Sequence, residues 1–330
     1  MEYARLGRSE VAVSRIIFGA WVTGGWMWGG VEDEESIAAI RKAVDLGITT
    51  IDTAPVYGFG HSERIVGEAI KGRREDVVIA TKCGLRWDTT EGAGHFETVD
   101  LEGNPVVVVK GLKYDSVLGE IDGSLERLGV DYVDLYQCHW PDPTTPIKET
   151  IRALSRILDE GKARAIGMSN FTPEMIEEAL RYAPVASDQP LYNMLDRGTE
   201  QDVLPFCAEN EVGVIVYSPL HQGLLTGKVS AKRTFPEGDQ RNWKPWFQPR
   251  NRKRVLAFLK KLGPIAAKHG KTLAQVAANW CLCRPGVTAA IVGARRPEQV
   301  EENAGAAGWK LDDEDLAQIR ACLDGLGEPE

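Results

Sequence analysis

Short apolar runs alternate with longer amphipathic segments along almost the whole chain. This alternation is typical of repeated strand-helix units around a parallel sheet. The apolar runs are short and rich in β-branched residues, as buried parallel strands are. We therefore predict strands over residues 16–20, 49–53, 77–82, 132–139, 163–169, 187–190, 213–218 and 289–292.

The amphipathic segments between these runs predict the helices that complete the units. Gly47 and Gly129 mark two helix ends, and Thr172 with Pro173 places a capping residue before a favourable first helical position. The predicted helices cover residues 34–46, 62–71, 114–128, 147–160, 172–181, 201–211, 272–283 and 297–307. Eight such units predict an α/β fold, a closed (β/α)₈ TIM barrel.

Three segments lie outside the eight units. Residues 2–6 and 11–13 predict an N-terminal β-hairpin, residues 251–269 are a further segment, and the amphipathic residues 313–323 predict an extra C-terminal helix. In a closed barrel these pieces cap the bottom or pack on the outside. Pro- and Gly-containing stretches fall between strand and helix at regular spacing, so residues 1–330 are predicted to form a single barrel domain.

Two long connections, residues 85–113 and 219–250, follow the third and the seventh predicted strand. We expect them to be loops without secondary structure. Long loops of this kind are usually functional or mobile, and barrel enzymes build their sites at the C-terminal ends of the strands. Both connections are therefore expected to line the mouth of the site.

The composition narrows the class of partner. With 43% hydrophobic residues, 26% charged residues and a net charge of −9, the chain has a globular composition that opposes broad attraction to nucleic acid or anionic lipid. It begins without a secretory signal and holds no run of 18 apolar residues. We expect a cytoplasmic protein, a monomer or a weak homo-oligomer, with no nucleic-acid or membrane partner.

Four polar residues end successive predicted strands or follow them closely. Asp52 ends the second strand and Tyr57 follows in a Pro-containing loop; either one alone is as typical of an ordinary surface loop. The buried third strand ends in Lys82, whose charge needs an anionic partner or a shifted pKa, and the fourth ends in His139. Because these strands are neighbours in a barrel, we expect all four side chains to meet at the C-terminal opening, or mouth, of the barrel.

Motifs in a fixed order extend this pattern along nearly the whole chain. They are Asp52-Thr53-Ala54-Pro55-Val56-Tyr57-Gly58 with Gly60, Ser62 and Glu63; Thr81-Lys82; His139-Trp140-Pro141-Asp142; residues 161–170; Gln189-Pro190-Leu191-Tyr192-Asn193; Tyr217-Ser218-Pro219-Leu220 with Gly223-Leu224-Leu225; and residues 291–295 with Gln299, Glu302 and Asn303. Together they resemble the aldo-keto reductase family, in its bacterial aldehyde and ketone reductase branch. The probability that so many motifs occur in this order by chance is very small.

The resemblance implies reversible, NADPH-dependent reduction of aldehydes or ketones to alcohols. Tyr57 is then the general acid, and Lys82 beside it is expected to lower its pKa by favouring the phenolate. Asp52 keeps Lys82 charged and holds its ammonium group in position beside Tyr57. His139 donates or relays a hydrogen bond to the oxygen of a small-molecule carbonyl substrate.

The resemblance also implies a nicotinamide cofactor site. Ser169, Asn170 and Gln189 would bind the carboxamide, and Tyr217 would stack on the ring. The remaining implied cofactor residues are Ser218, Leu220, Gly223, Leu225, Gly293, Arg295, Gln299 and Asn303. Arg295 suits a 2′-phosphate, although the chain has Gly293-Ala294 where the best-known family pattern has Lys-Ser, and Gln299 where it has Arg. NADPH is favoured over NADH.

Tryptophans gather in the connections expected at the mouth. As a group they predict an apolar-walled carbonyl pocket of modest size, although ordinary packing under long loops explains any single one equally well. The pocket residues predicted from this set are Trp21, Trp87, Trp140 and Trp243.

Two other classes of function remain open at the level of sequence. One is a nicotinamide-binding regulatory or interaction subunit on the same fold with little turnover, since a protein can keep cofactor binding after it has lost fast turnover. The other is a metal hydrolase or an aldolase that uses Lys82 as a Schiff base, which the five scattered histidines do not favour.

Overall fold

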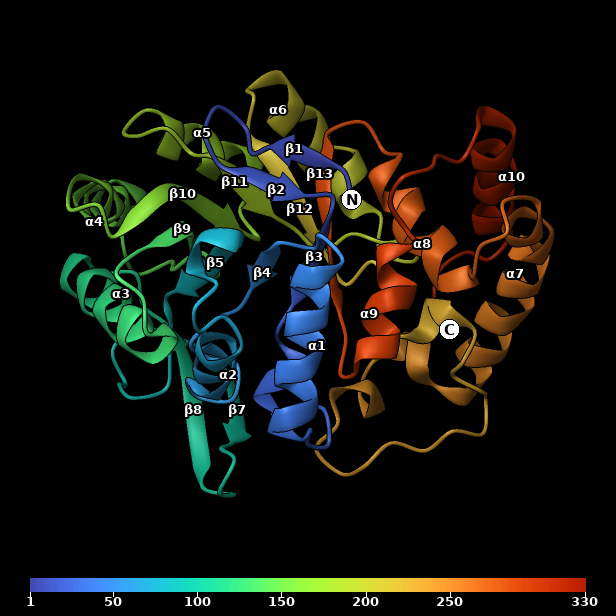
Figure 1. Ribbon diagram of the computed structural model, residues 1–330, viewed down its shortest axis with the longest axis horizontal. Coiled ribbons are helices and arrows are strands. Elements are labelled where there is room, and N and C mark those ends of the chain that lie inside the picture. The colour runs from blue at the N-terminus through green and yellow to red at the C-terminus, as the bar shows by residue number, and fades with distance from the viewer.

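The computed structural model describes residues 1–330 and contains a closed barrel of parallel strands (Figure 1). Each strand bonds to the strand on either side, and the last strand pairs with the first. In barrel order they are β3 (Ile16–Gly19), β4 (Thr50–Asp52), β5 (Val78–Cys83), β9 (Val133–Cys138), β10 (Ala163–Ser169), β11 (Ser187–Gln189), β12 (Gly213–Tyr217) and β13 (Val287–Gly293). All eight predicted strands are barrel strands, so the predicted (β/α)₈ fold is confirmed.

The helices lie around the outside of the barrel (Figure 1). The eight predicted from the amphipathic segments are α1 (Asp33–Asp45), α2 (His61–Ala69), α3 (Tyr114–Leu128), α4 (Ile147–Asp159), α5 (Pro173–Leu180), α6 (Val203–Glu209), α8 (Leu273–Leu282) and α9 (Pro297–Ala304). Two more lie outside the repeated units and contact each other: α7 (Pro249–Lys268) and α10 (Asp313–Asp324), the predicted C-terminal helix. No helix has both the length and the apolar composition required to cross a membrane.

Local signals set the helix boundaries. At α5, the Thr172 hydroxyl accepts the N–H of Met175, and Pro173 occupies the first turn, where its missing N–H costs nothing. α3 ends at Gly129, which adopts the left-handed conformation (φ 65°) that a helix C-cap requires. These are two of the boundaries that the sequence predicted.

The N-terminal hairpin closes the bottom of the barrel. Its strands β1 (Tyr3–Arg5) and β2 (Ala12–Ser14) pair antiparallel. Leu6, Val11 and Val13 join the apolar cluster inside the barrel. Figure 1 shows this hairpin at one end of the barrel and a second hairpin, β7 (Ala93–Val99) with β8 (Pro105–Lys110), projecting from the other. The C-terminal mouth is therefore left for the candidate site.

The first long connection, residues 85–113, is not the structureless loop that we predicted. It forms an antiparallel sheet in the order β6-β8-β7. Its strands are β6 (Leu85–Arg86), β7 (Ala93–Val99) and β8 (Pro105–Lys110). Cross-strand hydrogen bonds and packing on the mouth stabilise this sheet, and neither can be read from the hydrophobic pattern of one segment.

The second long connection, residues 219–250, has no strand or α-helix, as expected, apart from the first residues of α7. It contains short 3₁₀ turns. The 3₁₀ turns of this connection are η4 (Leu224–Thr226), η5 (Gln240–Asn242) and η6 (Pro245–Phe247). Three further 3₁₀ turns lie elsewhere in the chain: η1 (Val22–Gly24), η2 (Arg74–Asp76) and η3 (Gly198–Glu200).

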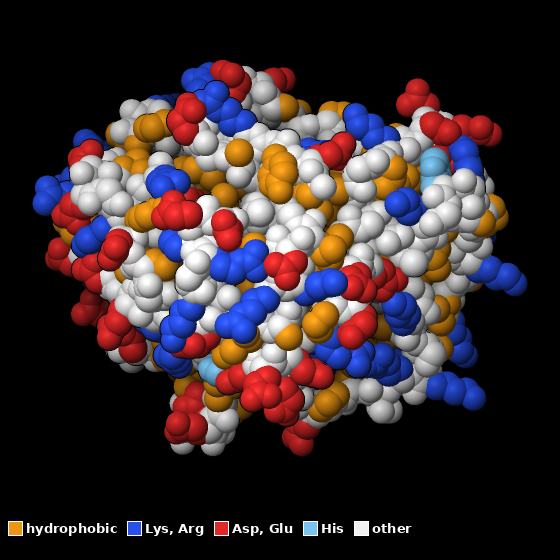
Figure 2. Space-filling model, viewed as in Figure 1, with side chains coloured by type: hydrophobic (Ala, Val, Ile, Leu, Met, Phe, Trp, Pro, Cys, Tyr) orange, Lys and Arg blue, Asp and Glu red, His pale blue; other side chains and the backbone are white.

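Charged side chains of both signs intermingle over the surface. Figure 2 shows lysine and arginine beside aspartate and glutamate across the face in view. The net charge of −9 is therefore not concentrated in a single patch on this face.

Two helical glycines give a test of packing against helix propensity. A Cβ on Gly67 in α2 would lie 2.6 Å from the Leu128 carbonyl oxygen of the adjacent α3, whereas a Cβ on Gly119 in α3 would meet nothing within 4 Å. We expect Gly67→Ala to lower the free energy of unfolding by about 1–3 kcal/mol through overpacking. Gly119→Ala should raise it by about 0.5–1 kcal/mol through helix propensity.

Urea denaturation of the two variants beside the wild type measures both effects. Helix propensity alone would stabilise both proteins, so a gain in stability for Gly67→Ala would contradict the close approach of α2 to α3.

Candidate active site

A buried lysine forms the centre of the mouth. β4 and β5 are paired so that Asp52 lies opposite Ala80, which brings the end of β5 beside Asp52. Lys82 is 0% exposed, and its Nζ donates to Asp52 Oδ1 at 2.7 Å and to the Thr53 carbonyl at 2.9 Å. Its third short contact is the Tyr57 hydroxyl at 3.2 Å. The anionic partner that the sequence predicted for Lys82 is Asp52.

Tyr57 is held by a compact turn after β4. The backbone N–H of Tyr57 donates to the Ala54 carbonyl at 3.1 Å, and Gly58 follows with φ 64°. A Cβ on Gly58 would lie 2.2 Å from the Gly24 carbonyl oxygen of η1. Only glycine fits this approach of two backbones, and the contact fixes where the tyrosine ring stands.

His139 completes the group from the adjacent strand. Its ring meets the Tyr57 ring edge-on at 5.6 Å, and its backbone N–H donates to the Cys83 carbonyl. Burial lowers the pKa of His139 well below its ordinary value, and the positive charge of Lys82 acts in the same direction. The imidazole is therefore neutral at physiological pH and can donate one N–H without carrying charge.

The direction of the tyrosine shift differs from the sequence prediction. Burial raises the pKa of Tyr57 well above 10, and the Asp52 carboxylate raises it further. Burial also lowers the pKa of Lys82, while Asp52 opposes that change. The net direction is therefore opposite to the lowering that we expected from Lys82, because desolvation of the phenol and the Asp52 charge both favour the protonated form. The phenol holds its proton at neutral pH.

Two glutamines bind the far side of the ion pair. Gln189 Nε2 donates to Asp52 Oδ2 at 2.8 Å and to Gln137 Oε1 at 3.3 Å. Asp52 thus receives Lys82 on one oxygen and Gln189 on the other. The sequence assigned Gln189 to a cofactor and missed Gln137, which faces inward on β9 without any motif to mark it.

The ends of β10, β11 and β12 bring a second polar group together. The Ser169 hydroxyl donates to the Gln189 carbonyl at 2.8 Å. Asn170, in the left-handed conformation (φ 62°), donates to the His139 carbonyl at 3.1 Å and accepts the Tyr217 hydroxyl at 3.0 Å. The predicted carboxamide-binding residues therefore lie together, beside the Lys82 group.

The predicted phosphate and adenosine residues form two tight turns. After β12, Ser218 has φ 57°, and the Leu220 carbonyl accepts the N–H of Gly223 at 3.0 Å and of Leu225 at 3.1 Å. In the turn from β13 into α9, Gln299 Oε1 accepts the Arg295 N–H at 2.7 Å and Asn303 Nδ2 donates to the Gly293 carbonyl at 3.3 Å.

Arg295 reaches back across the mouth. Its guanidinium donates to the Trp28 carbonyl at 2.5 Å and forms no ion pair. Burial lowers the pKa of Arg295, and the charge of Arg241 adds to this shift although Arg241 is itself paired with Asp239. An unpaired, half-buried guanidinium is suited to bind a phosphate.

Buried polar atoms without partners accompany these turns. They are Nε1 of Trp21, Nε1 of Trp28, Oε1 of Gln222 and Nε2 of Gln240. These four atoms are free to bond a polar ligand at the mouth. Serine, amide and arginine groups beside them match the carboxamide and phosphates of a nicotinamide dinucleotide.

The aromatic residues predicted for the pocket are brought together with one exception. Trp21 stacks on Tyr57 at 5.9 Å, and Trp87 meets Phe59 at 5.5 Å. Trp87 and Trp140 pack with Tyr57 against one apolar cluster at the mouth. Trp243 is 65% exposed and makes no aromatic contact.

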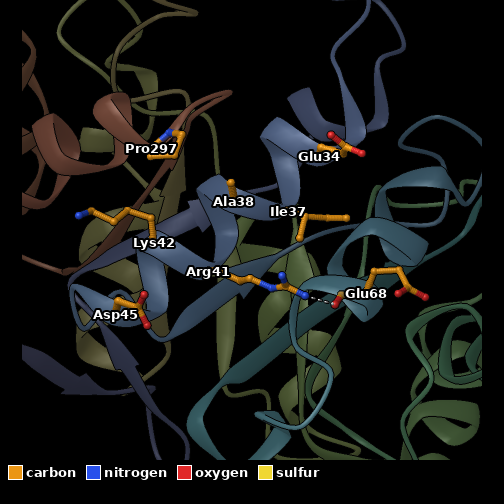
Figure 3. Close-up of a pocket in the computed structure, with 8 residues that line it drawn as sticks. All are labelled: Glu34, Ile37, Ala38, Arg41, Lys42, Asp45, Glu68 and Pro297. Atoms are coloured by element: carbon orange, nitrogen blue, oxygen red, sulfur yellow. Dashed lines mark hydrogen bonds between the residues drawn. The ribbon is translucent and has the colours of Figure 1, made fainter.

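A separate surface hollow lies on the helical layer. It is lined by residues of α1 with Glu68 of α2 and Pro297 of α9, and Figure 3 shows Arg41 reaching the Glu68 carbonyl across it. Its walls are largely charged or polar, and several of its charges are already paired, Lys42 with Glu301 and Asp45 with Arg73. None of the candidate residues lines it.

Comparison with known proteins agrees with the geometry of the mouth. The model of the aldo/keto reductase family matches residues 15–324. The chain is 41% identical to the aldo-keto reductase YhdN of Bacillus subtilis, over 98% of this chain and 94% of that protein. It is 39% identical to the NADH-specific methylglyoxal reductase of Escherichia coli, over 99% of each.

A solved structure gives the same result in three dimensions. The glycerol dehydrogenase of Gluconobacter oxydans superposes with a TM-score of 0.88 at 38% identity, over 98% of this chain and 95% of that one. Family model, relatives and structure agree, and the chain belongs to the aldo/keto reductase family.

Proposed function

We propose that this protein reduces an aldehyde or ketone to the alcohol with NADPH, and that Tyr57 is the proton donor. The observation that carries the proposal is the buried Lys82, whose Nζ bonds Asp52 and Tyr57 together at the mouth. A charged lysine fixed beside a protonated phenol is suited to deliver a proton to a carbonyl oxygen.

The chain's own residues act on the substrate oxygen. Negative charge develops there as the carbonyl is reduced, and a reduced nicotinamide supplies the hydride when bound. Tyr57 donates its proton to that oxygen, and the phenolate left behind is stabilised by Lys82 at 3.2 Å. Asp52 keeps Lys82 charged against the cost of burial. Neutral His139 donates a hydrogen bond that orients the carbonyl.

The second polar group would hold the cofactor. Ser169, Asn170 and Gln189 offer the mixture of donors and acceptors that a carboxamide needs, and the Tyr217 ring offers a stacking surface. The turn around Gly223 would receive the pyrophosphate. Arg295, with no carboxylate partner, favours the 2′-phosphate of NADPH over NADH.

Tyr57→Phe removes the proposed acid and keeps the ring. We expect kcat for reduction of a panel of aldehydes and ketones to fall by about 10²–10⁴-fold, because general acid catalysis contributes that much. Oxidation of NADPH followed at 340 nm measures the rate, and fluorescence titration with NADPH checks that binding is kept.

The same panel separates the enzyme from a regulatory subunit. Tight NADPH binding by the wild type without turnover of any carbonyl would favour a cofactor-binding regulatory role. A Tyr57→Phe protein with undiminished turnover would show that another group donates the proton.

The pKa directions predict the pH profile for reduction. Tyr57 must keep its proton, which it does below its raised pKa, and His139 must be neutral, which it is above its lowered pKa. We therefore expect neither Tyr57 nor His139 to change kcat/KM between about pH 6.5 and pH 9, the range between the ordinary imidazole and phenol values. Lys82 must stay charged and burial lowers its pKa, so any alkaline loss of rate should come from Lys82. An acidic limb inside that range, absent from the substrate alone, would contradict the direction given for His139.

Arg295→Ala tests the choice of cofactor. We expect the KM for NADPH to rise about tenfold or more, the loss of one charge-assisted contact, while the KM for NADH changes by less than about threefold. Arg181→Ala, at the exposed C-cap of α5, is the matched loss of one positive charge. Equal changes for the two cofactors would exclude recognition of the 2′-phosphate by Arg295.

A further inference from the structure

The β7–β8 hairpin contributes its inner face to the mouth. Phe96 stacks on Trp26 at 5.8 Å, and the Trp26 indole N–H donates to Thr98 Oγ1 at 3.2 Å. Val108 is buried in the same apolar cluster as Trp26, and Tyr57 packs against that cluster. The hairpin is therefore one wall of the mouth beside the proposed proton donor.

A β-bulge turns one more side chain to this inner face. Pairing of β7 with β8 shifts between Gly94 and Phe96, which leaves His95 as the extra residue. In a regular strand His95 and Phe96 would face opposite sides, but both are half-buried here. The His95 ring lies 4.9 Å from Phe96 and 5.2 Å from Trp140, the residue after His139.

Lys110 reaches the same place from β8. It shares the inward face of that strand with Val106 and Val108, at alternate positions. Its Nζ lies over the Trp140 ring, 5.4 Å from the centroid. Trp140 thus contacts His95 and Lys110, and the two polar groups stand beside the carbonyl-reducing centre.

The Lys110 ammonium has no ion-pair or hydrogen-bond partner in the chain, and two acids of the same connection are engaged elsewhere. Glu91 pairs with Lys113 at 3.0 Å and Asp88 with Arg86 at 2.6 Å. Asp142, after β9, accepts the Leu112 N–H and the hydroxyls of Thr144 and Thr145. A half-buried cation left unpaired at the edge of a binding pocket is suited to an anionic ligand.

His95 adds a neutral hydrogen-bonding group. Neither nitrogen of the His95 ring forms a hydrogen bond within the chain. His139, the second imidazole at the mouth, is assigned to the substrate carbonyl oxygen in the proposed function. Burial and the charge of Lys110 lower the pKa of His95 to about 4, so the ring is uncharged near neutral pH. One ammonium and one neutral donor match a single negative charge.

We propose that Lys110 and His95 form an anion-binding subsite of the substrate pocket, and that this protein prefers aldehydes or ketones carrying a carboxylate away from the carbonyl. This inference rests on the proposed function. The carboxylate is bound and not consumed; the carbonyl carbon takes the hydride of NADPH and its oxygen takes the proton of Tyr57, leaving alcohol and NADP⁺.

Matched pairs of substrates test the subsite. 4-Oxobutanoate is compared with butanal, and 4-carboxybenzaldehyde with 4-methylbenzaldehyde. In wild type we expect kcat/KM to favour the carboxylated member of at least one pair by about tenfold, as one charge-assisted contact allows. The preference should shrink as NaCl rises from 0.05 M to about 0.5 M, because salt screens a partly exposed charge.

Substitutions assign the preference to the two residues. Lys110→Met should raise the KM for the carboxylated substrate about tenfold with kcat kept, and Lys110→Arg should restore most of the preference. His95→Phe keeps an aromatic ring and should cost about threefold for the carboxylated substrate. Lys113→Met removes an exposed, already paired lysine of the same connection and should change neither substrate.

The outcomes separate this inference from the proposed function. Turnover of the uncharged aldehydes with no preference for either carboxylated partner would overturn the subsite and leave the reductase standing. Equal losses for charged and uncharged substrates in Lys110→Met would assign Lys110 a structural role and overturn it as well. No turnover of any of the four aldehydes would contradict the reductase itself.

Discussion

The mouth of this barrel depends on a buried ion pair between Lys82 and Asp52. A lysine with no exposed surface loses its hydration, and only a close carboxylate and carbonyl oxygens offset that loss. Lys82 therefore fixes where the end of β5, the turn after β4 and the Tyr57 hydroxyl lie. Because the same carboxylate also accepts a hydrogen bond from Gln189, the constraint extends to β11. The proposed reactive centre and the proposed cofactor-binding group are therefore held by the same carboxylate.

The barrel makes this arrangement possible by bringing distant strand ends together. Asp52 and Gln189 are 137 residues apart in the chain but 2.8 Å apart in space. The same closure places Asn170 between the His139 carbonyl and the Tyr217 hydroxyl. Each strand contributes one or two side chains at its C-terminal end, where side chains converge while the interior below stays packed. The geometry is precise because the groups sit on strands or on turns held by backbone contacts, such as Gly58 against Gly24.

The β7–β8 hairpin differs from the barrel in what it contributes. The strand ends carry the groups proposed for proton transfer, and the hairpin brings side chains that touch the aromatic wall, His95 and Lys110 among them. A connection can change its sequence without disturbing the parallel sheet, so substrate preference can vary while the chemistry is kept. The bulge in β7 is one example, since its one extra residue places the His95 side chain on the inner face of the hairpin.

The sequence by itself determined the repeated architecture, because hydrophobic periodicity is a local property: all eight barrel strands, their helices and the N-terminal hairpin coincide with patterns readable in single segments. Ordered motifs also placed Asp52, Tyr57, Lys82 and His139 at one mouth. Only the tertiary structure decided the rest. The sheet of residues 85–110, the inward turn of His95 and the link from Gln189 to Asp52 depend on partners far away in the chain. The direction of the Tyr57 pKa depends on how completely folding removes water from the phenol, and burial is a property of the assembled barrel rather than of any segment.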